Sequence, residues 1–232
     1  MRTIAIVPIK HHSSRVPGKN YRLICGRPLF CWMLDTLLST PEIQQVVIDT
    51  DSPVIKSGVS EHFGGEPRIR VYDRPAELCG DDVSTNALLE NVIADLKLEA
   101  DYFVHAHVTN PLVRPETISA AIAKLQASPD ADSIFGVKVH HTRFYTKDGR
   151  DMNHDRSVLI PTQDLDPIYE ENSCVYVFPV QTLLEHRARI GPNALLLPMS
   201  DSESVDIDWP DDFEYAAYQL AKNRGLATEN VV

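Results

Sequence analysis

Residues 3–20 read TIAIVPIKHHSSRVPGKN and join a short apolar run to a polar, cationic loop. The run at 3–7 is almost continuously apolar, which is typical of a strand covered on both faces of a parallel sheet. The loop that follows carries Lys10, Arg15 and Lys19, although the chain as a whole has a net charge of −11. Ligands of parallel sheets bind at the carboxyl ends of the strands. We therefore expect this loop to form part of a binding site.

The rest of the chain alternates between short β-rich runs and amphipathic stretches. This alternation predicts an α/β fold with a doubly wound, mostly parallel, Rossmann-like sheet. The length of 232 residues fits a single domain that covers residues 1–232. The predicted strands after the first are 46–50, 69–72, 102–108, 133–139 and 174–178, and the predicted helices are 27–38, 84–98, 115–126 and 210–223.

Residues 140–172 interrupt this alternation. The segment is polar, irregular and too long for a plain connection. We expect an inserted excursion from the sheet, either a lid or a dimerisation arm, and the alternative is a disordered surface loop. The apolar residues Val158–Ile160, Ile168 and Tyr169 favour a segment that docks.

Composition and charge exclude several classes of protein. Hydrophobic residues make up 43% and charged residues 24% of the chain, as in a globular protein. The acidic balance argues against a general nucleic-acid binder, which needs a basic surface. No apolar run approaches the ~18 residues that span a membrane, and the start does not resemble a secretory signal. The four cysteines form no CxxC pair, so we expect free thiols and a cytoplasmic protein.

The loop at 8–20 has the chemistry of a phosphate-binding site. Arg and Lys side chains form charge-assisted hydrogen bonds with phosphate oxygens. The hydroxyls of Ser13 and Ser14 and the backbone N–H groups can add further donors. The GxxxxGKS/T pattern of a Walker loop is absent. The alternative is a solvated basic turn.

Asp206 and Asp208 form a second candidate site. Residues two apart on an extended segment point to the same side, and two carboxylates there repel each other unless a cation lies between them. Carboxylates together with nucleotide phosphates are the usual ligands of Mg²⁺. The alternative is a solvated strand end or a helix-capping cluster, because Asp211 and Asp212 follow.

Six short motifs occur in order over residues 3–220. They are Ser13 and Arg15 with PGKN at 17–20, VVIDTDS at 46–52, RPAEL at 74–78 with Asp81 and Ser84, TNPL at 109–112, Glu171-Asn172 with VYVF at 175–178, and DID at 206–208 with Asp212-Phe213. In this order and spacing they resemble the acylneuraminate cytidylyltransferases, or CMP-sialic acid synthetases, and the related CMP-sugar-acid synthetases. Each motif alone is weak, whereas the ordered set is a strong signal.

The resemblance implies a nucleotidyltransferase sheet with a dimerisation arm, and hence a homodimer. It implies a CTP-dependent cytidylyltransferase, in which a hydroxyl of a nonulosonic-type sugar acid attacks the α-phosphate of CTP. The products would be a CMP-sugar acid and pyrophosphate, and Mg²⁺ is the expected cofactor. The alternatives are a cytidylyltransferase for another acid, such as an octulosonate or a phosphonate, and a nucleotide-binding protein without catalysis.

Carried over by position, the resemblance also implies roles for single residues. The catalytic residues would be Arg15 and Lys19, which stabilise charge at phosphorus, and Asp208. The nucleotide side would comprise Lys10 and Ser13 at the triphosphate, Asn20, Arg74 and Ser84 at the cytidine and ribose, and Asp206 with Asp208 at Mg²⁺. The acceptor side would comprise His107 and Thr109, then Lys138 and Arg143 as candidates for the carboxylate, and Tyr169 and Asn172 at the hydroxyls.

The chain departs from the family's pattern in the first loop and in the fifth motif. Lys10 stands where an arginine lies along the phosphates, and His11 and His12 replace two glycines. Ser173 replaces the glycine that follows Asn172. Because glycine permits close approach of the backbone, the two histidines change the loop's shape or add imidazole donors near the phosphates. These departures leave the identity of the acceptor open.

Overall fold

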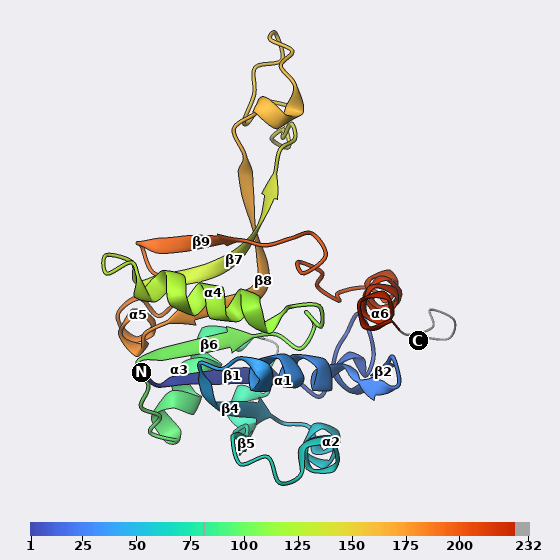
Figure 1. Ribbon diagram of the computed structural model, residues 1–232, viewed down its shortest axis with the longest axis vertical. Helices are drawn as coiled ribbons and strands as arrows, with labels where there is room; N and C mark the ends of the chain where they lie inside the picture. Colours follow the sequence, from blue (N-terminus) through green and yellow to red (C-terminus); the bar gives the residue numbers. More distant parts are fainter. Residues whose placement is uncertain (81, 226–232) are drawn as a thin grey trace.

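The computed structural model describes residues 1–80 and 82–225, so the predicted match at Asp81 lies outside it. Within these ranges, seven strands form one sheet in the order β5-β4-β1-β6-β8-β7-β9 (Figure 1). All neighbouring strands are parallel except where β8 pairs with β6 and β7. The prediction of a doubly wound, mostly parallel sheet is therefore confirmed. The strands are β1 (Thr3–Ile9), β4 (Ile43–Thr50), β5 (Ile69–Asp73), β6 (Tyr102–Ala106), β7 (Ser133–His140), β8 (Ile168–Phe178) and β9 (Ala194–Pro198), and β2 (Leu23–Ile24) pairs separately with β3 (Arg27–Pro28).

The helices follow the predicted pattern with two additions. The predicted helix at 115–126 has the observed bounds, and the other three differ from prediction by a few residues at their ends. The sequence analysis missed α2 because it buries just two apolar residues, Ile55 and Val59, so its apolar stripe is narrow. It also missed α5 and β9, which are short. The helices are α1 (Leu29–Ser39), α2 (Pro53–Phe63), α3 (Thr85–Asp95), α4 (Pro115–Gln126), α5 (Val180–His186) and α6 (Pro210–Arg224).

Both faces of the sheet are covered, as the almost continuous apolar run in β1 predicts. Successive side chains of a strand point to opposite faces. Ala5 and Val7 pack in the cluster that contains α1 and α4, whereas Ile4 and Ile6 pack in the cluster that contains α3 and α5. A third cluster joins α6 to α1 and to the segment that precedes α6. No helix in the described ranges is long and apolar enough to cross a membrane.

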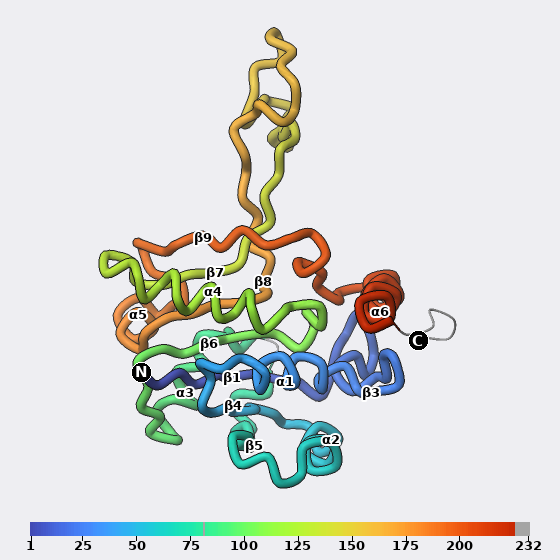
Figure 2. Tube along the Cα trace, in the orientation of Figure 1, coloured from blue at the N-terminus to red at the C-terminus, as the bar shows by residue number. Residues whose placement is uncertain are grey.

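Residues 141–167, called the arm below, leave the sheet between β7 and β8 and return to it (Figures 1 and 2). The arm contains one isolated bridge, between Tyr145 and Asp151, and a short 3-10 helix at Thr162–Asp164. The excursion predicted at 140–172 is shorter in the structure, because His140 ends β7 and residues 168–172 begin β8. Pairing with β7, such as that of Val139 with Tyr169, brings the start of β8 into the sheet. A role of the arm in dimerisation stays a prediction.

Candidate active site

A cavity of about 380 Å³ lies at the carboxyl ends of β1, β5 and β6, where a parallel sheet places its ligands. The loop after β1 lines one wall, and the segment before α6 lines the opposite wall. The lining residues are Pro8, Lys10, His12, Ser13, Ser14, Arg15, Lys19, Asn20, Arg74, Thr85, Leu88, His107, Val108, Thr109, Ser173, Asp206 and Asp208.

The two walls meet through ion pairs with Asp208. Arg15 Nη2 donates to Asp208 Oδ1 at 2.6 Å, and Lys19 Nζ lies 3.5 Å from the same oxygen. Lys19 also donates to the carbonyl oxygen of Ile207, and its side chain is 9% exposed. Charges from opposite ends of the sequence are thus concentrated in one cavity, which is where the family resemblance implies that they would meet a nucleotide.

The loop after β1 is held by its own turn and by side-chain hydrogen bonds. Gly18 adopts φ +68° at the start of the short 3-10 helix η1 (Lys19–Tyr21), and an added Cβ there would lie 3.0 Å from the Tyr21 ring. Asn20 Nδ2 donates to the carbonyl oxygen of Lys10 at 2.8 Å, which closes the loop at its base. These contacts present Lys10 and Lys19 to the same cavity.

The two histidines of the loop have different surroundings. The backbone N–H of His11 donates to Asp51 Oδ1 at 2.8 Å, and its ring is hydrogen-bonded to Ser52 Oγ at 2.7 Å. The same ring stacks on Tyr21. His12 is exposed and lines the cavity. His11 therefore anchors the loop to the β4–α2 turn, and His12 is the imidazole available to a ligand.

Asp206 is half-buried, and one of its carboxylate oxygens is completely buried. Burial and the neighbouring charge of Asp208 raise the pKa of Asp206, against a hydrogen bond from Thr109 and the charges of Lys19 and Arg15. Asp206 Oδ1 is buried and has no hydrogen-bond partner among the described residues. An unsatisfied carboxylate oxygen beside a second carboxylate is suited to a cation of the size and hardness of Mg²⁺.

Arg74 follows β5 and forms a buried ion pair with Asp49 of β4. Arg74 Nε lies 3.1 Å from both carboxylate oxygens, and Nη2 donates to the Asp49 carbonyl oxygen at 3.0 Å. Burial raises the pKa of Asp49 in spite of this pairing. Arg74 Nη1 is buried and finds no acceptor within the described part of the chain. Arg74 lines the cavity, but its side chain is completely buried beside Asp49, so it forms part of the wall behind the cavity surface.

The floor of the cavity contains a cluster of buried rings. The His105 and His107 rings lie 4.4 Å apart, and Tyr176 of β8 stacks on His105. Burial, together with the charges of Arg189 and Lys19, lowers the pKa of His107 to about 4. Burial also lowers the pKa of His105 well below its usual range. Both rings are therefore neutral near pH 7. His107 lines the cavity, whereas His105 is completely buried and does not line it.

Five predicted site residues do not line this cavity. The Ser84 hydroxyl caps α3 by accepting from the Ala87 N–H at 3.2 Å, and its neighbour Thr85 lines the cavity instead. Asn172 Nδ2 donates to Ser204 Oγ at 3.0 Å, so its side chain contacts the segment before α6 and not the cavity. The other three are Lys138, which pairs with Asp201, Arg143, which donates to the Ile160 carbonyl oxygen in the arm, and Tyr169, which is exposed at the base of the arm.

The sequence matches one family model over residues 4–226, and that model describes cytidylyltransferases. The chain belongs to the cytidylyltransferase family. A CMP-N,N'-diacetyllegionaminic acid synthase of Legionella pneumophila is 28% identical over 222 residues, which are 92% of this chain and 94% of the relative. An N-acylneuraminate cytidylyltransferase of Streptococcus agalactiae is 25% identical over 227 residues, which are 92% of this chain but 52% of that longer relative.

A solved structure supports the cytidylyltransferase fold. CMP:2-keto-3-deoxy-manno-octonic acid synthetase, complexed with CTP, superposes with a TM-score of 0.67 over 96% of this chain and 100% of the other. The sequence identity is 16%, so this comparison speaks to the fold alone.

The cysteines take no part in the chemistry of this cytidylyltransferase cavity. All four are free, and none lines the cavity. Burial raises the pKa of the Cys31 thiol to about 12, and that of Cys174 is raised further. Such thiols carry no thiolate at neutral pH, so they do not act as nucleophiles.

The sequence analysis missed three lining residues that have no motif of their own. Thr85 and Leu88 lie on α3, where they read as ordinary helix residues. Val108 was predicted to be the last residue of the strand at 102–108. In the structure β6 ends at Ala106, and His107–Thr109 follow it and line the cavity. No local pattern in the sequence marks these positions as part of a site.

Proposed function

We propose that this cytidylyltransferase couples CTP to a nonulosonic-type sugar acid and forms a CMP-sugar acid and pyrophosphate. The observation that carries the proposal is the cavity in which Arg15 and Lys19 face the Asp206/Asp208 pair. The two relatives that match 92% of this chain are named for legionaminic and acylneuraminic acids, which are nonulosonic acids. These names support the acceptor class.

The reaction is a displacement at the α-phosphorus of CTP. The acceptor's hydroxyl oxygen forms a bond to phosphorus, the bond to the bridging oxygen of pyrophosphate breaks, and the hydroxyl proton leaves to solvent or to a nearby base. Lys10, Arg15 and Lys19 would neutralise charge on the phosphates, and Arg74 and Asn20 would line the cytidine end of the cavity. Catalysis of this kind depends chiefly on positioning and on electrostatic stabilisation.

Asp206 and Asp208 would hold Mg²⁺ together with the nucleotide's phosphate oxygens. The buried, unpartnered Oδ1 of Asp206 fits a hard cation, and the described residues contain no cluster of three or more His, Cys, Asp or Glu side chains that could hold a metal alone. One or two carboxylates completed by substrate phosphates is the usual arrangement for Mg²⁺. The ion would supply further charge neutralisation at the α-phosphate.

The acceptor would lie at the His107 and Ser173 end of the cavity. Both residues line it, and a neutral His107 can donate one hydrogen bond and accept another. Lys138, Arg143 and Tyr169 could reach an acceptor in a second subunit, because they lie on the arm or at its base. We propose a homodimer on this ground, and a cytoplasmic location, where CTP is made and thiols stay reduced.

Pyrophosphate release tests the function directly. The protein is incubated with Mg²⁺, each of the four nucleoside triphosphates, and a panel of nonulosonic acids, octulosonates and phosphonates. Release with CTP and one nonulosonic acid is the expected result. Release with an octulosonate or a phosphonate alone would replace the acceptor class, and CTP binding without any release would indicate a binding protein.

A further inference from the structure

The segment that carries Asp206 and Asp208 has no regular structure of its own. Residues 199–209, called the acidic loop below, connect β9 to α6 without a helix or strand. Two carboxylates that share one cation must be held at a defined separation, and a segment without a backbone ladder cannot provide this alone. The contacts of the acidic loop with its neighbours therefore decide the geometry of the pair.

Glu203 is the most extensively bonded side chain of the acidic loop, although it lies outside the cavity. It is 4% exposed. Its carboxylate accepts from the Arg114 N–H at 3.2 Å, from Arg114 Nη2 at 2.8 Å and from Thr117 Oγ1 at 2.6 Å. Ser200 Oγ also donates to it, at 3.2 Å, from within the loop. A buried carboxylate with these donors is fully compensated.

The partners of Glu203 form the start of helix α4. Arg114 is the N-cap residue of α4, and its own side chain makes no capping hydrogen bond. The Glu203 carboxylate, from 89 residues away, accepts from the N–H of this N-cap residue and so lies near the positive end of the helix dipole. In spite of burial, the hydrogen bonds from Arg114 and Thr117 lower the pKa of Glu203, so it is charged at neutral pH. The acidic loop is thus attached to a rigid element of the fold.

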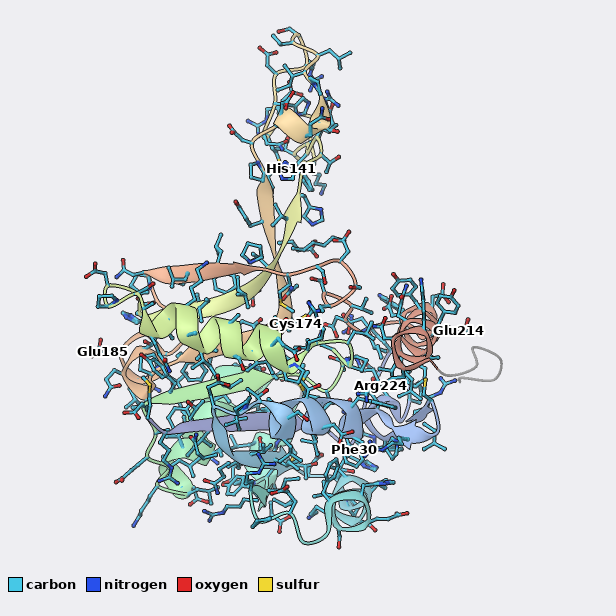
Figure 3. All side chains as sticks on the ribbon, in the orientation of Figure 1. Phe30, His141, Cys174, Glu185, Glu214 and Arg224 are labelled. Carbon is cyan, nitrogen blue, oxygen red and sulfur yellow. The ribbon has the colours of Figure 1, made fainter. Side chains whose placement is uncertain are left out.

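Backbone contacts carry this attachment from Glu203 to the aspartates. Asn110 Nδ2 donates to the Val205 carbonyl oxygen at 3.1 Å, and the Ile207 N–H donates to the Thr109 carbonyl oxygen at 2.9 Å. The Cys174 thiol, at the centre of the body in Figure 3, donates to the Glu203 carbonyl oxygen at 3.5 Å. Asp206 lies between two tethered neighbours, and Asp208 follows directly after them.

We infer that Glu203 is a positioning residue for the Asp206/Asp208 pair. By binding Arg114 and Thr117 at the start of α4, its carboxylate sets where the loop runs past Thr109 and hence where the two aspartates enter the cavity. Its effect on turnover rests on the proposed function, whereas its effect on the loop does not.

The test compares Glu203→Ala and Glu203→Gln with Ser119→Ala. Ser119 also lies on α4 and ties it to a distant loop, by donating to Glu42 Oε2 at 2.7 Å, but it makes no contact with the acidic loop. Three readouts are measured: thermal stability, hydrogen exchange at the Ile207 amide, and binding of Mn²⁺ as a probe ion in the presence of CTP. A variant that acts on stability alone changes the melting temperature but not the exchange at Ile207 or the binding of Mn²⁺.

Glu203→Ala is expected to speed exchange at Ile207 and to weaken Mn²⁺–CTP binding about tenfold, a typical effect of losing a side chain that orients metal ligands. Glu203→Gln keeps an acceptor oxygen and should restore part of both readouts. Ser119→Ala should lower thermal stability alone. If the parent protein binds no Mn²⁺–CTP, but Glu203→Ala still exchanges faster at Ile207, the proposed function would be refuted and the positioning role would not. Unchanged Ile207 exchange and Mn²⁺ binding in Glu203→Ala would refute the positioning role, whatever its melting temperature.

Discussion

The cavity and the arm differ in where their side chains come from. The cavity combines residues from Pro8 to Asp208, and its Arg15–Asp208 hydrogen bond joins positions 193 residues apart. The arm is one continuous stretch whose hydrogen bonds are mostly local, such as Arg156 Nε to Asp151 Oδ1 at 2.8 Å. The cavity is therefore a product of the whole fold, whereas the arm is a separate hairpin-like extension (Figure 1).

The two regions also differ in what they leave uncovered. The cavity exposes charged and polar groups to a ligand and is backed by buried rings. The arm exposes apolar side chains, among them Leu159 at 87% and Val158 at 56%. A single chain supplies every residue that lines the proposed nucleotide site, but it leaves apolar side chains of the arm exposed to solvent. The comparison indicates that substitutions in the cavity should alter chemistry, and substitutions in the arm should alter assembly.

The largest expected effect is that of Asp208→Ala. Removing one carboxylate of the pair should lower the rate of pyrophosphate release on the order of 10³-fold, because charge at phosphorus loses its stabilisation. Asp211→Ala, which removes an exposed acidic residue of α6 outside the cavity, is the matched control. A normal Mg²⁺-dependent rate in Asp208→Ala would remove the acidic pair from the mechanism.

Lys19→Ala should act on nucleotide binding. The loss of one charge-assisted contact to a phosphate should weaken CTP binding about 10- to 100-fold in calorimetry. Lys56→Ala, which removes an exposed lysine paired with Asp73, should leave the affinity unchanged. If both variants bind CTP like the parent protein, Lys19 does not belong to the phosphate site.

The free energy of unfolding of the protein should fall as the pH falls from about 6.5 to 4. In the unfolded chain His107 takes up a proton near pH 6.5, whereas in the folded chain its pKa is about 4. The unfolded state binds more protons in this window, so the free energy of unfolding rises with pH. For His107 alone the difference is about 3 kcal/mol, from 1.36 kcal/mol per pH unit, and His105 acts in the same direction.

Denaturant unfolding at several pH values measures this loss. His105→Phe should reduce the slope of stability against pH, because one buried group no longer titrates. His141→Gln, in the arm away from the buried rings (Figure 3), should leave the slope unchanged. Equal slopes for all three proteins would contradict the assignment of the pH dependence to the cavity floor.

Leu159→Asp should have the smallest effect on the free energy of unfolding. A charge at this exposed position should change the stability of the isolated chain by no more than ~0.5 kcal/mol, as surface substitutions do. In the proposed homodimer the same charge would lie in an interface, so light scattering should show a shift from dimer to monomer. A parent protein that is already monomeric would separate the arm from dimerisation.

Much of the fold could be read from local patterns. The strand–helix alternation predicted the sheet class, and the apolar spacing of α4 predicted its bounds. The patterns failed where an element has few buried residues, as in α2, and where pairing extended a strand, as in β8. Glu170 and Glu171 are charged, and they belong to a strand because β7 supplies partners for their backbone.

The sequence predicted some residues of the candidate site and not others, because a local pattern does not record contacts between distant parts of the chain. The cations of the first loop and the Asp206/Asp208 pair carry their chemistry in their spacing, and all of them line the cavity. Ser84 and Asn172 lie at motif positions, yet their hydrogen-bonding groups face a helix end and the acidic loop. Glu203 has no motif, because its partners Arg114 and Thr117 are distant in the chain.

The sequence by itself determined the class of the sheet, the two charged sites at its edge and the family. These properties depend on residue type and on separations of a few positions, which a linear pattern records. The tertiary structure alone decided that Arg15 meets Asp208, that His11 serves the fold while His12 faces the cavity, and that Glu203 anchors the acidic loop. These properties depend on contacts between residues far apart in the chain, which form when the sheet brings the strand ends together.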